Sequence, residues 1–109
     1  MEIQLNNPYA QEQLKAQVAL MQVMDPELNI NIVDMGLIYE VIFSTPGETL
    51  VRMTLSTPYC PMGHAIEQGV LNVLSDAFPD RTASIQLVWE PEWNFDRISD
   101  AGKEQLNML

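Results

Sequence analysis

The chain has 109 residues and carries 15 Asp and Glu against 5 Lys and Arg, a formal net charge of −10. With 47% hydrophobic residues this length can bury a core without disulfides or a structural metal, so we expect a single domain over residues 1–109 with its core at about 10–106. The negative charge repels phosphate backbones and anionic lipid surfaces, so neither nucleic acid nor a membrane is expected as a partner.

The first predicted element is a helix that begins after Asn7. Asn7 is a residue type that caps helices, Pro8 suits a first helical position, and Pro26 is expected to end the helix near Asp25. Apolar residues recur at helical spacing and predict one buried stripe, formed by Ala10, Leu14, Val18 and Met21.

A pair of antiparallel strands is predicted next. From Leu37 to Phe43 the odd-numbered residues are apolar or aromatic and are expected to share one face. Residues 45–48 fit a type II turn in which Gly47 has positive φ, and a second strand follows over about 49–55. Both strands have apolar residues on both faces, which indicates helices on one side of the sheet and a partner or further layer on the other.

A second helix and a third strand complete the predicted sheet. Apolar spacing predicts a helix over about 61–77, and alternation predicts a strand over 84–89 that pairs in parallel after a right-handed crossover. Asn94 and Ser99 are expected to cap short C-terminal helical turns. The predicted fold class is α+β: a small mixed three-stranded sheet, made of an antiparallel hairpin and one strand after a helical crossover, packed with two main helices.

Cys60 is the one cysteine in the chain, so it cannot form a disulfide within the chain. A cytoplasmic location is expected, because no signal-type segment opens the sequence and no apolar run approaches a membrane span. Cys60 lies just before the second predicted helix, where unpaired N–H groups and the helix dipole favour the thiolate. Both a reactive thiol and a small buried side chain stay open as interpretations.

His64 lies four residues after Cys60, with Glu67 one turn further along. The three side chains share a helix face if Cys60 is already helical, and thiolate, imidazole and carboxylate are ligands for zinc or iron. An exposed histidine beside a solvated carboxylate explains the same spacing, because one Cys and one His without a paired motif form a weak metal signature.

Asp25 and Glu27 place two carboxylates after the predicted end of the first helix, where the helix dipole disfavours them. They could collect a cation or accept hydrogen bonds from the Cys60 loop. The alternative is an Asx turn at Asp25 or Asp34, with Gly36 forming a tight bend before the first strand.

Both tryptophans of the chain, Trp89 and Trp93, lie at the end of the third predicted strand. Large aromatic residues beside a proline form either a rigid wall at the strand end or a cover over the edge of the core. The core role is favoured, because aromatic side chains dominate apolar burial.

Three motifs in this order resemble a known family. They are Asp25-Pro-Glu-Leu followed by Ile32-Val-Asp-Met-Gly-Leu-Ile-Tyr, then Thr57-Pro-Tyr-Cys-Pro, then Val88-Trp-Glu-Pro-Glu-Trp. Over roughly residues 10–106 the chain is identified as a member of the iron–sulfur cluster assembly domain family of the SufT-like and PaaD-like proteins. Met35 stands where leucine is commoner in the family, a change that conserves volume.

The resemblance implies an α+β domain that acts in the maturation of iron–sulfur proteins rather than as a turnover enzyme. Cys60 matches the family's reactive cysteine, which is expected to bind iron, another metal such as zinc, or a cluster, or to receive sulfur. The resemblance also implies a pocket beside the thiol, with candidate residues Asp25, Glu27, Leu28, Ser56, Thr57 and Pro61. Trp89 matches a framework position, whereas His64 lies outside the family pattern and is a candidate ligand on spacing alone.

One thiolate cannot hold a cluster that normally takes four ligands, so a bound cluster must be shared with a second copy, a partner or small thiols. We therefore expect transient binding of iron or an iron–sulfur cluster, a homodimer, and iron–sulfur client proteins and assembly machinery as partners. Two other functions stay open. The first is a thiol-dependent enzyme or an auxiliary subunit of an aromatic-ring-oxidising, phenylacetate-type enzyme, and the second is a pure protein-interaction adaptor.

Overall fold

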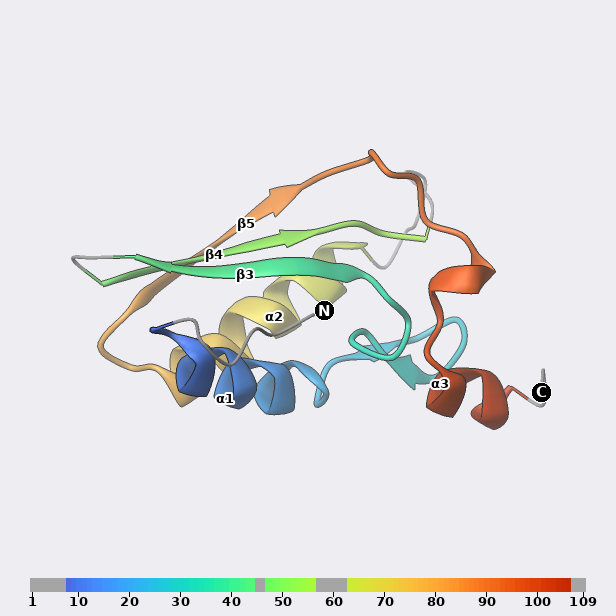
Figure 1. The fold of residues 1–109 in the computed structure, drawn as a ribbon, viewed down its shortest axis with the longest axis horizontal. Helices are drawn as coiled ribbons and strands as arrows, with labels where there is room; N and C mark the ends of the chain where they lie inside the picture. Colours follow the sequence, from blue (N-terminus) through green and yellow to red (C-terminus); the bar gives the residue numbers. More distant parts are fainter. Residues whose placement is uncertain (1–7, 45–46, 57–62, 107–109) are drawn as a thin grey trace.

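The computed structural model describes the chain in the stretches 8–44, 47–56 and 63–106. Figure 1 shows a layered arrangement in which a sheet lies across two helices, α1 (Ala10–Leu20) and α2 (Gly63–Ala77). Within these stretches, no helix has the length and apolar character needed to cross a membrane.

The larger sheet in the described part of the chain pairs β3 (Ile38–Ser44), β4 (Glu48–Met53) and β5 (Thr82–Leu87), in that order. β3 and β4 are antiparallel, whereas β5 pairs in parallel with β4 after the crossover through α2. The structure therefore confirms the predicted mixed sheet and α+β fold class, although the third strand begins at Thr82 rather than Ser84.

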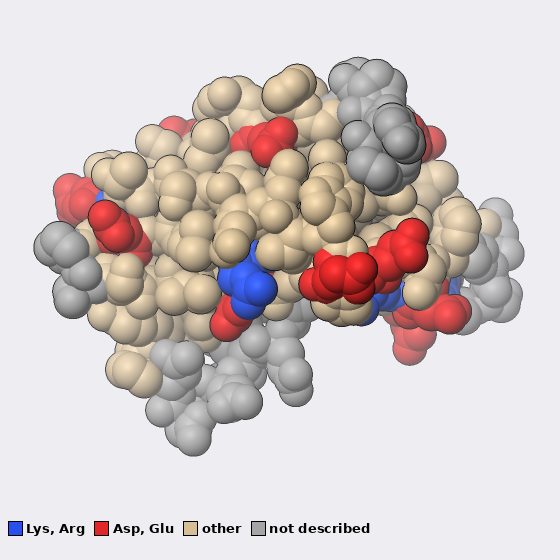
Figure 2. Space-filling view, turned by 90° about the horizontal axis from the view of Figure 1, so that it is seen from above, with Lys and Arg blue, Asp and Glu red and all other residues tan. Residues whose placement is uncertain are grey.

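The core lies between the sheet and the helices. Val41 of β3 pairs with Val51 of β4, which pairs with Ile85 of β5, and both valines are buried. α2 covers them with a buried stripe formed by Ile66, Val70 and Leu74. No described element covers the opposite face, and Figure 2, a view onto it, shows mostly uncharged side chains, with Asp and Glu more prominent than Lys and Arg.

A β-bulge at the start of β3 changes which residues face the core. Ile38 pairs with Met53 and Glu40 pairs with Arg52, so Tyr39 is an extra residue in the ladder. Regular alternation predicted Ile38 on the face opposite Val41 and Phe43, but the bulge turns it to their side, where it is buried. Tyr39 is half-buried.

The stripe predicted for the first helix is wrong. Leu14, Val18 and Met21 lie on the solvent side of α1, and Val18 is 65% exposed. The residues that α1 buries are Ala10, Ala16, Ala19 and Leu20. A face rich in alanine lets the helix backbone approach its neighbours closely, so three small residues and Leu20 pack against the core in place of the large residues of the predicted stripe.

α1 also ends earlier than predicted, at Leu20 rather than near Asp25. Two short strands follow, β1 (Met24–Asp25) and β2 (Ile30–Asn31), which pair in antiparallel fashion. The N-cap position of α1 is Tyr9, and the predicted cap Asn7 lies outside the described residues.

The C-terminal segment forms the expected short helical turns, η1 (Phe95–Arg97) and α3 (Asp100–Gln105). The Asn94 side chain accepts a hydrogen bond from the Asp96 N–H at 2.9 Å, and the Ser99 hydroxyl oxygen accepts one from the Gly102 N–H at 3.1 Å. Both predicted caps are therefore confirmed.

Candidate functional site

The Asp34 side chain anchors the C-terminal segment to the loop before β3. Its Oδ1 accepts a hydrogen bond from the Ser99 hydroxyl at 2.8 Å, and its Oδ2 accepts one from the Asn31 amide at 2.7 Å. The Ser99 N–H also donates to the Asp34 carbonyl at 2.7 Å. Both carboxylate oxygens thus accept from side chains rather than from a nearby backbone N–H, so the Asx turn considered for Asp34 is not formed; instead the Asn31 Oδ1 accepts from the Asp34 N–H at 2.9 Å.

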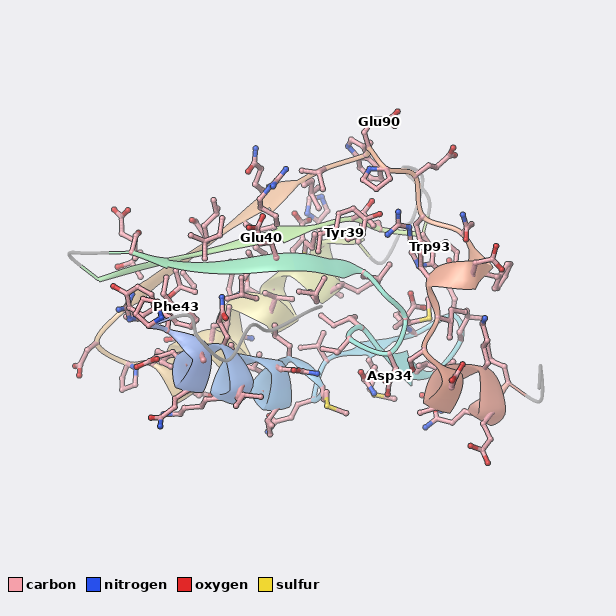
Figure 3. All side chains as sticks on the ribbon, in the orientation of Figure 1. Asp34, Tyr39, Glu40, Phe43, Glu90 and Trp93 are labelled. Carbon is pink, nitrogen blue, oxygen red and sulfur yellow. The ribbon has the colours of Figure 1, made fainter. Side chains whose placement is uncertain are left out.

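The next two residues continue this anchor. The Met35 carbonyl accepts a hydrogen bond from the Trp93 indole N–H at 2.7 Å. Gly36 has a φ of 78°, and a Cβ at this position would collide with the Arg97 carbonyl, so a glycine is needed where the two segments meet. Figure 3 shows Asp34 and Trp93 at the same end of the molecule.

The first of two cavities at this end is the acidic cavity, of about 330 Å³. Its lining residues are Thr54, Leu55 and Ser56, which follow β4, and Trp89, Glu90, Glu92 and Trp93. Trp89 is 42% exposed and forms part of the wall, whereas Trp93 packs against the core. Of the two roles considered for the tryptophans, Trp89 therefore has that of a wall at the strand end and Trp93 that of a cover over the core. Glu90 and Glu92 give the cavity its negative charge.

The acidic cavity adjoins the start of the segment that contains Cys60, and one of its lining residues, Leu55, contacts the residue that follows the segment. Ser56 is the last described residue before that segment and Gly63 is the first after it. A Cβ on Gly63 would lie 2.9 Å from Leu55 Cδ1, so the start of α2 packs against the cavity wall. The predicted site residues Thr57, Cys60 and Pro61 lie outside the described residues.

Asp25 and Glu27 lie in different environments. Asp25 is 1% exposed, and its Oδ1 accepts hydrogen bonds from the N–H groups of Glu27 at 2.8 Å and Leu28 at 3.3 Å. This is an Asx turn, the structural alternative considered for Asp25. Glu27 is exposed, Leu28 packs against the core, and neither they nor Asp25 line the acidic cavity. Of the described pocket candidates, Ser56 is the one that lines it.

His64 lies in the first turn of α2 with a fully exposed side chain. Its Nδ1 is 3.7 Å from Glu67 Oε2. Within the described stretches, no group of three or more His, Cys, Asp or Glu side chains could hold a metal ion. The described residues therefore supply a His–Glu pair but not a complete ligand set.

The second cavity, the basic cavity, shares Glu90 with the first and has a volume of about 450 Å³. Its lining residues are Gly36, Ile38, Tyr39, Arg52, Glu90, Pro91 and Arg97. The Tyr39 hydroxyl donates a hydrogen bond to the Pro91 carbonyl at 2.7 Å and so connects the bulge in β3 to the wall that both cavities use. This cavity could not be predicted from the sequence, because no local motif joins Arg52 to Arg97.

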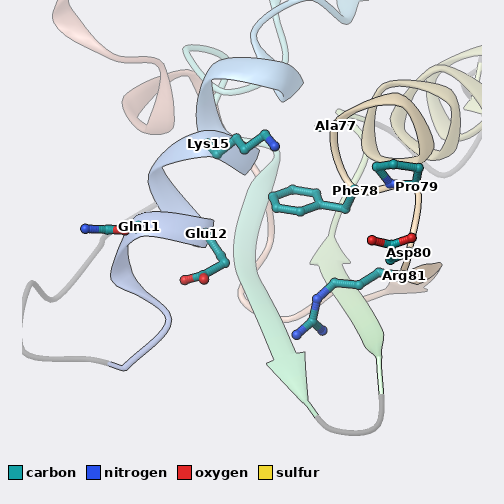
Figure 4. Close-up of a pocket in the computed structure, with 8 residues that line it drawn as sticks. All are labelled: Gln11, Glu12, Lys15, Ala77, Phe78, Pro79, Asp80 and Arg81. Carbon is teal, nitrogen blue, oxygen red and sulfur yellow. The ribbon is translucent and has the colours of Figure 1, made fainter.

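A further cavity of about 440 Å³ lies between α1 and the loop after α2, at the other end of the sheet (Figure 4). Its basic side chains are engaged in structural contacts. Arg81 Nη1 donates to the carbonyls of Ser44 at 3.1 Å and Glu48 at 2.9 Å, and Lys15 Nζ lies 4.9 Å from the centre of the Phe78 ring. The contacts of Arg81 join the loop after α2 to the ends of β3 and β4 where the hairpin turns.

A family model described as iron–sulfur cluster assembly protein matches residues 13–87. The chain belongs to this family. The matched range includes Cys60 and ends before Trp89, so the tryptophan wall of the acidic cavity lies outside it.

Relatives named for the maturation of Fe-S proteins match most of the chain. The Fe-S protein maturation auxiliary factor YitW of Bacillus subtilis is 36% identical over 100 residues, which are 90% of this chain and 98% of the relative. The Fe-S protein maturation auxiliary factor SufT of Staphylococcus aureus is 38% identical over 86 residues, 79% of this chain and 98% of the relative. A domain of unknown function from Bacillus anthracis has a crystal structure that matches with a TM-score of 0.82 at 33% identity, covering 88% of this chain and 92% of that one.

Proposed function

We propose that this member of the iron–sulfur cluster assembly family is a maturation factor that carries iron or a cluster, or helps to transfer it, through Cys60 beside the acidic cavity. The observation that supports this most is the position of the acidic cavity: its lining residue Ser56 directly precedes the Cys60 segment, and its lining residue Leu55 contacts Gly63, which follows that segment. The metal or cluster is cargo that passes to client proteins, and the assembly machinery is the source from which it comes. The reducing cytoplasm, where Cys60 stays a thiol, is the proposed location.

The length of the chain between Ser56 and Gly63 limits how far Cys60 can be from this cavity. Cys60 is four residues after Ser56 and three before Gly63. An extended chain spans at most about 3.6 Å per residue, so the Cα of Cys60 lies within roughly 14 Å of that of Ser56 and roughly 11 Å of that of Gly63. Ser56 and Leu55 both line the cavity, and the Leu55 side chain also contacts Gly63.

The residues of the cavity suit a cationic cargo. Glu90 and Glu92 supply carboxylate oxygens, which attract iron ions, and Cys60 supplies the softer sulfur ligand that clusters require. Because the chain has one cysteine, we propose that a cluster is shared between two copies of the chain, each of which contributes Cys60. Zinc is an alternative cargo for the same donors, and His64 is the candidate additional ligand.

Anaerobic reconstitution with iron and sulfide tests this function. We expect the wild-type protein to take up iron and sulfide, with a loaded species of two chains in native mass spectrometry. We expect Cys60→Ser to lose most of this uptake, because the sulfur ligand is gone. Ser84→Ala, on the exposed face of β5, is the matched control and should load like the wild type. Equal and negligible uptake by the wild type and Cys60→Ser would contradict the carrier role.

A further inference from the structure

We propose that the basic cavity binds a small organic carboxylate, which the guanidinium groups of Arg97 and Arg52 hold while its carbon skeleton lies against Tyr39 and Pro91. This site is separate from the function proposed for Cys60 and is formed entirely by described residues. The following contacts carry the inference.

The Arg97 guanidinium group is held in place by two contacts that leave its Nη groups available to a ligand. Its Nε donates to the Glu92 carbonyl at 3.3 Å, and its Cζ lies 4.9 Å from the centre of the Tyr39 ring. The Tyr39 hydroxyl is itself bound to the Pro91 carbonyl. Neither Nη group of Arg97 has a protein partner among the described residues. A guanidinium group oriented in this way can donate two parallel hydrogen bonds to one carboxylate.

Arg52 brings a second positive charge to the cavity from β4. Its Nη1 donates to Glu40 Oε1 at 2.9 Å, and the two side chains are 41% and 51% exposed. Exposed ion pairs of this kind contribute little to stability, so the remaining N–H groups of Arg52 can turn toward a ligand at small cost. The cavity thus contains two of the five Lys and Arg residues of the chain.

The charge and the lining of the cavity select the class of ligand. The net charge of −10 repels large polyanions, but salt screens distant charges beyond about 8 Å, so a small anion inside the cavity responds mainly to the residues that line it. These are two arginines and one carboxylate, Glu90, so the positive charges outnumber the negative one. The volume of about 450 Å³ falls within the range of ligand pockets, roughly 300–1,000 Å³. Tyr39 and Pro91 offer apolar contacts that inorganic phosphate cannot use but a carbon skeleton can.

Titration with citrate, monitored by amide chemical shifts in about 150 mM salt, tests the site. We expect saturable binding to the wild-type protein without added metal, with shifts centred on residues 36–39 and 90–97. Inorganic phosphate, the second probe, should bind at least several-fold more weakly. Arg97→Gln should weaken citrate binding about tenfold or more, because a charge-assisted pair of hydrogen bonds is lost. Arg97→Lys should lie between the two, since it keeps the charge but not the paired donors.

Two further variants separate a lost ligand contact from a disturbed fold or a general charge effect. Arg52→Gln leaves the contacts of Arg97 with Tyr39 and Glu92 in place and should weaken citrate binding about threefold. Lys15→Gln removes a positive charge from the distant third cavity and should leave citrate binding unchanged. Absent or non-saturable citrate binding, unchanged affinity in both arginine variants, an equal loss in Lys15→Gln, or phosphate binding as tight as citrate would each overturn the proposal. None of these readouts depends on Cys60.

Discussion

The acidic and basic cavities share Glu90 but have opposite charge. The acidic cavity gathers Glu90 and Glu92 beside the segment that contains Cys60, whereas the basic cavity gathers Arg52 and Arg97 between β4 and η1. Residues 89–93 form a side of each cavity, and the anchor at residues 34–36 positions that shared wall. The net charge of −10 therefore predicts the charge of the acidic cavity but not that of the basic cavity. The fold brings Arg52 and Arg97, which are far apart in the sequence, to one place and so creates a local excess of positive charge.

The largest effect is expected from disturbing the anchor on which both cavities depend. In Gly36→Ala the new Cβ requires a left-handed backbone and meets the Arg97 carbonyl, so the free energy of unfolding should fall by about 3 kcal/mol. Urea denaturation measures this loss, and Ser84→Ala is the surface control, expected to stay within about 0.5 kcal/mol of the wild type. If Gly36→Ala is as stable as the wild type, the anchor does not hold the shared wall.

An intermediate effect is expected from Trp93→Phe. This change keeps an aromatic ring against the core but removes the indole N–H that donates to the Met35 carbonyl, so unfolding should become easier by about 1–2 kcal/mol. Trp89→Phe is the matched control, because the more exposed Trp89 should tolerate the same change within about 0.5 kcal/mol. Equal losses in the two variants would show that the Trp93 hydrogen bond does not distinguish them.

The smallest effect is expected from removing the negative charge of Glu90 or Glu92, which tests whether the two cavities differ in charge. Glu90 lines both cavities, whereas Glu92 lines the acidic one. Glu90→Gln should weaken anaerobic iron(II) binding about twofold and strengthen citrate binding by a similar factor, because one negative charge leaves both sites. Glu92→Gln should weaken iron(II) binding alone. If both variants change citrate affinity equally, the two cavities are not electrostatically distinct.

Most of the fold could be predicted because local patterns determine it. The apolar spacing of α2 and the alternation in the strands reflect which side chains face the core, and Asn94 and Ser99 cap their turns through near neighbours. The buried face of the first helix was predicted wrongly, because the buried Ala16 and Ala19 are only weakly hydrophobic whereas the larger Val18 is exposed. The bulge at Tyr39 could not be predicted, because apolar or aromatic residues continue at alternate positions through it without a break.

The candidate site was less accessible from the sequence, because long-range contacts build it. The motif around Trp89 indicated a framework role, and Ser56 was expected in a pocket, but their meeting in one cavity depends on how the strands pair. The hydrogen bond from Ser99 to Asp34 joins residues 65 positions apart, a distance that no motif or periodicity spans. For the same reason Arg52 and Arg97 were not recognised as neighbours.

That Ser99–Asp34 hydrogen bond has a consequence for the order of folding. Pairs in the β3–β4 hairpin are as close in sequence as Ser44 and Glu48, whereas the anchor must close a loop of 65 residues. Each doubling of loop length adds about 0.6 kcal/mol of closure entropy, so we expect the hairpin to form early and the anchor late. A nascent or partly unfolded chain would then have the β3–β4 hairpin before either cavity exists, and cargo binding would be confined to chains that have finished folding.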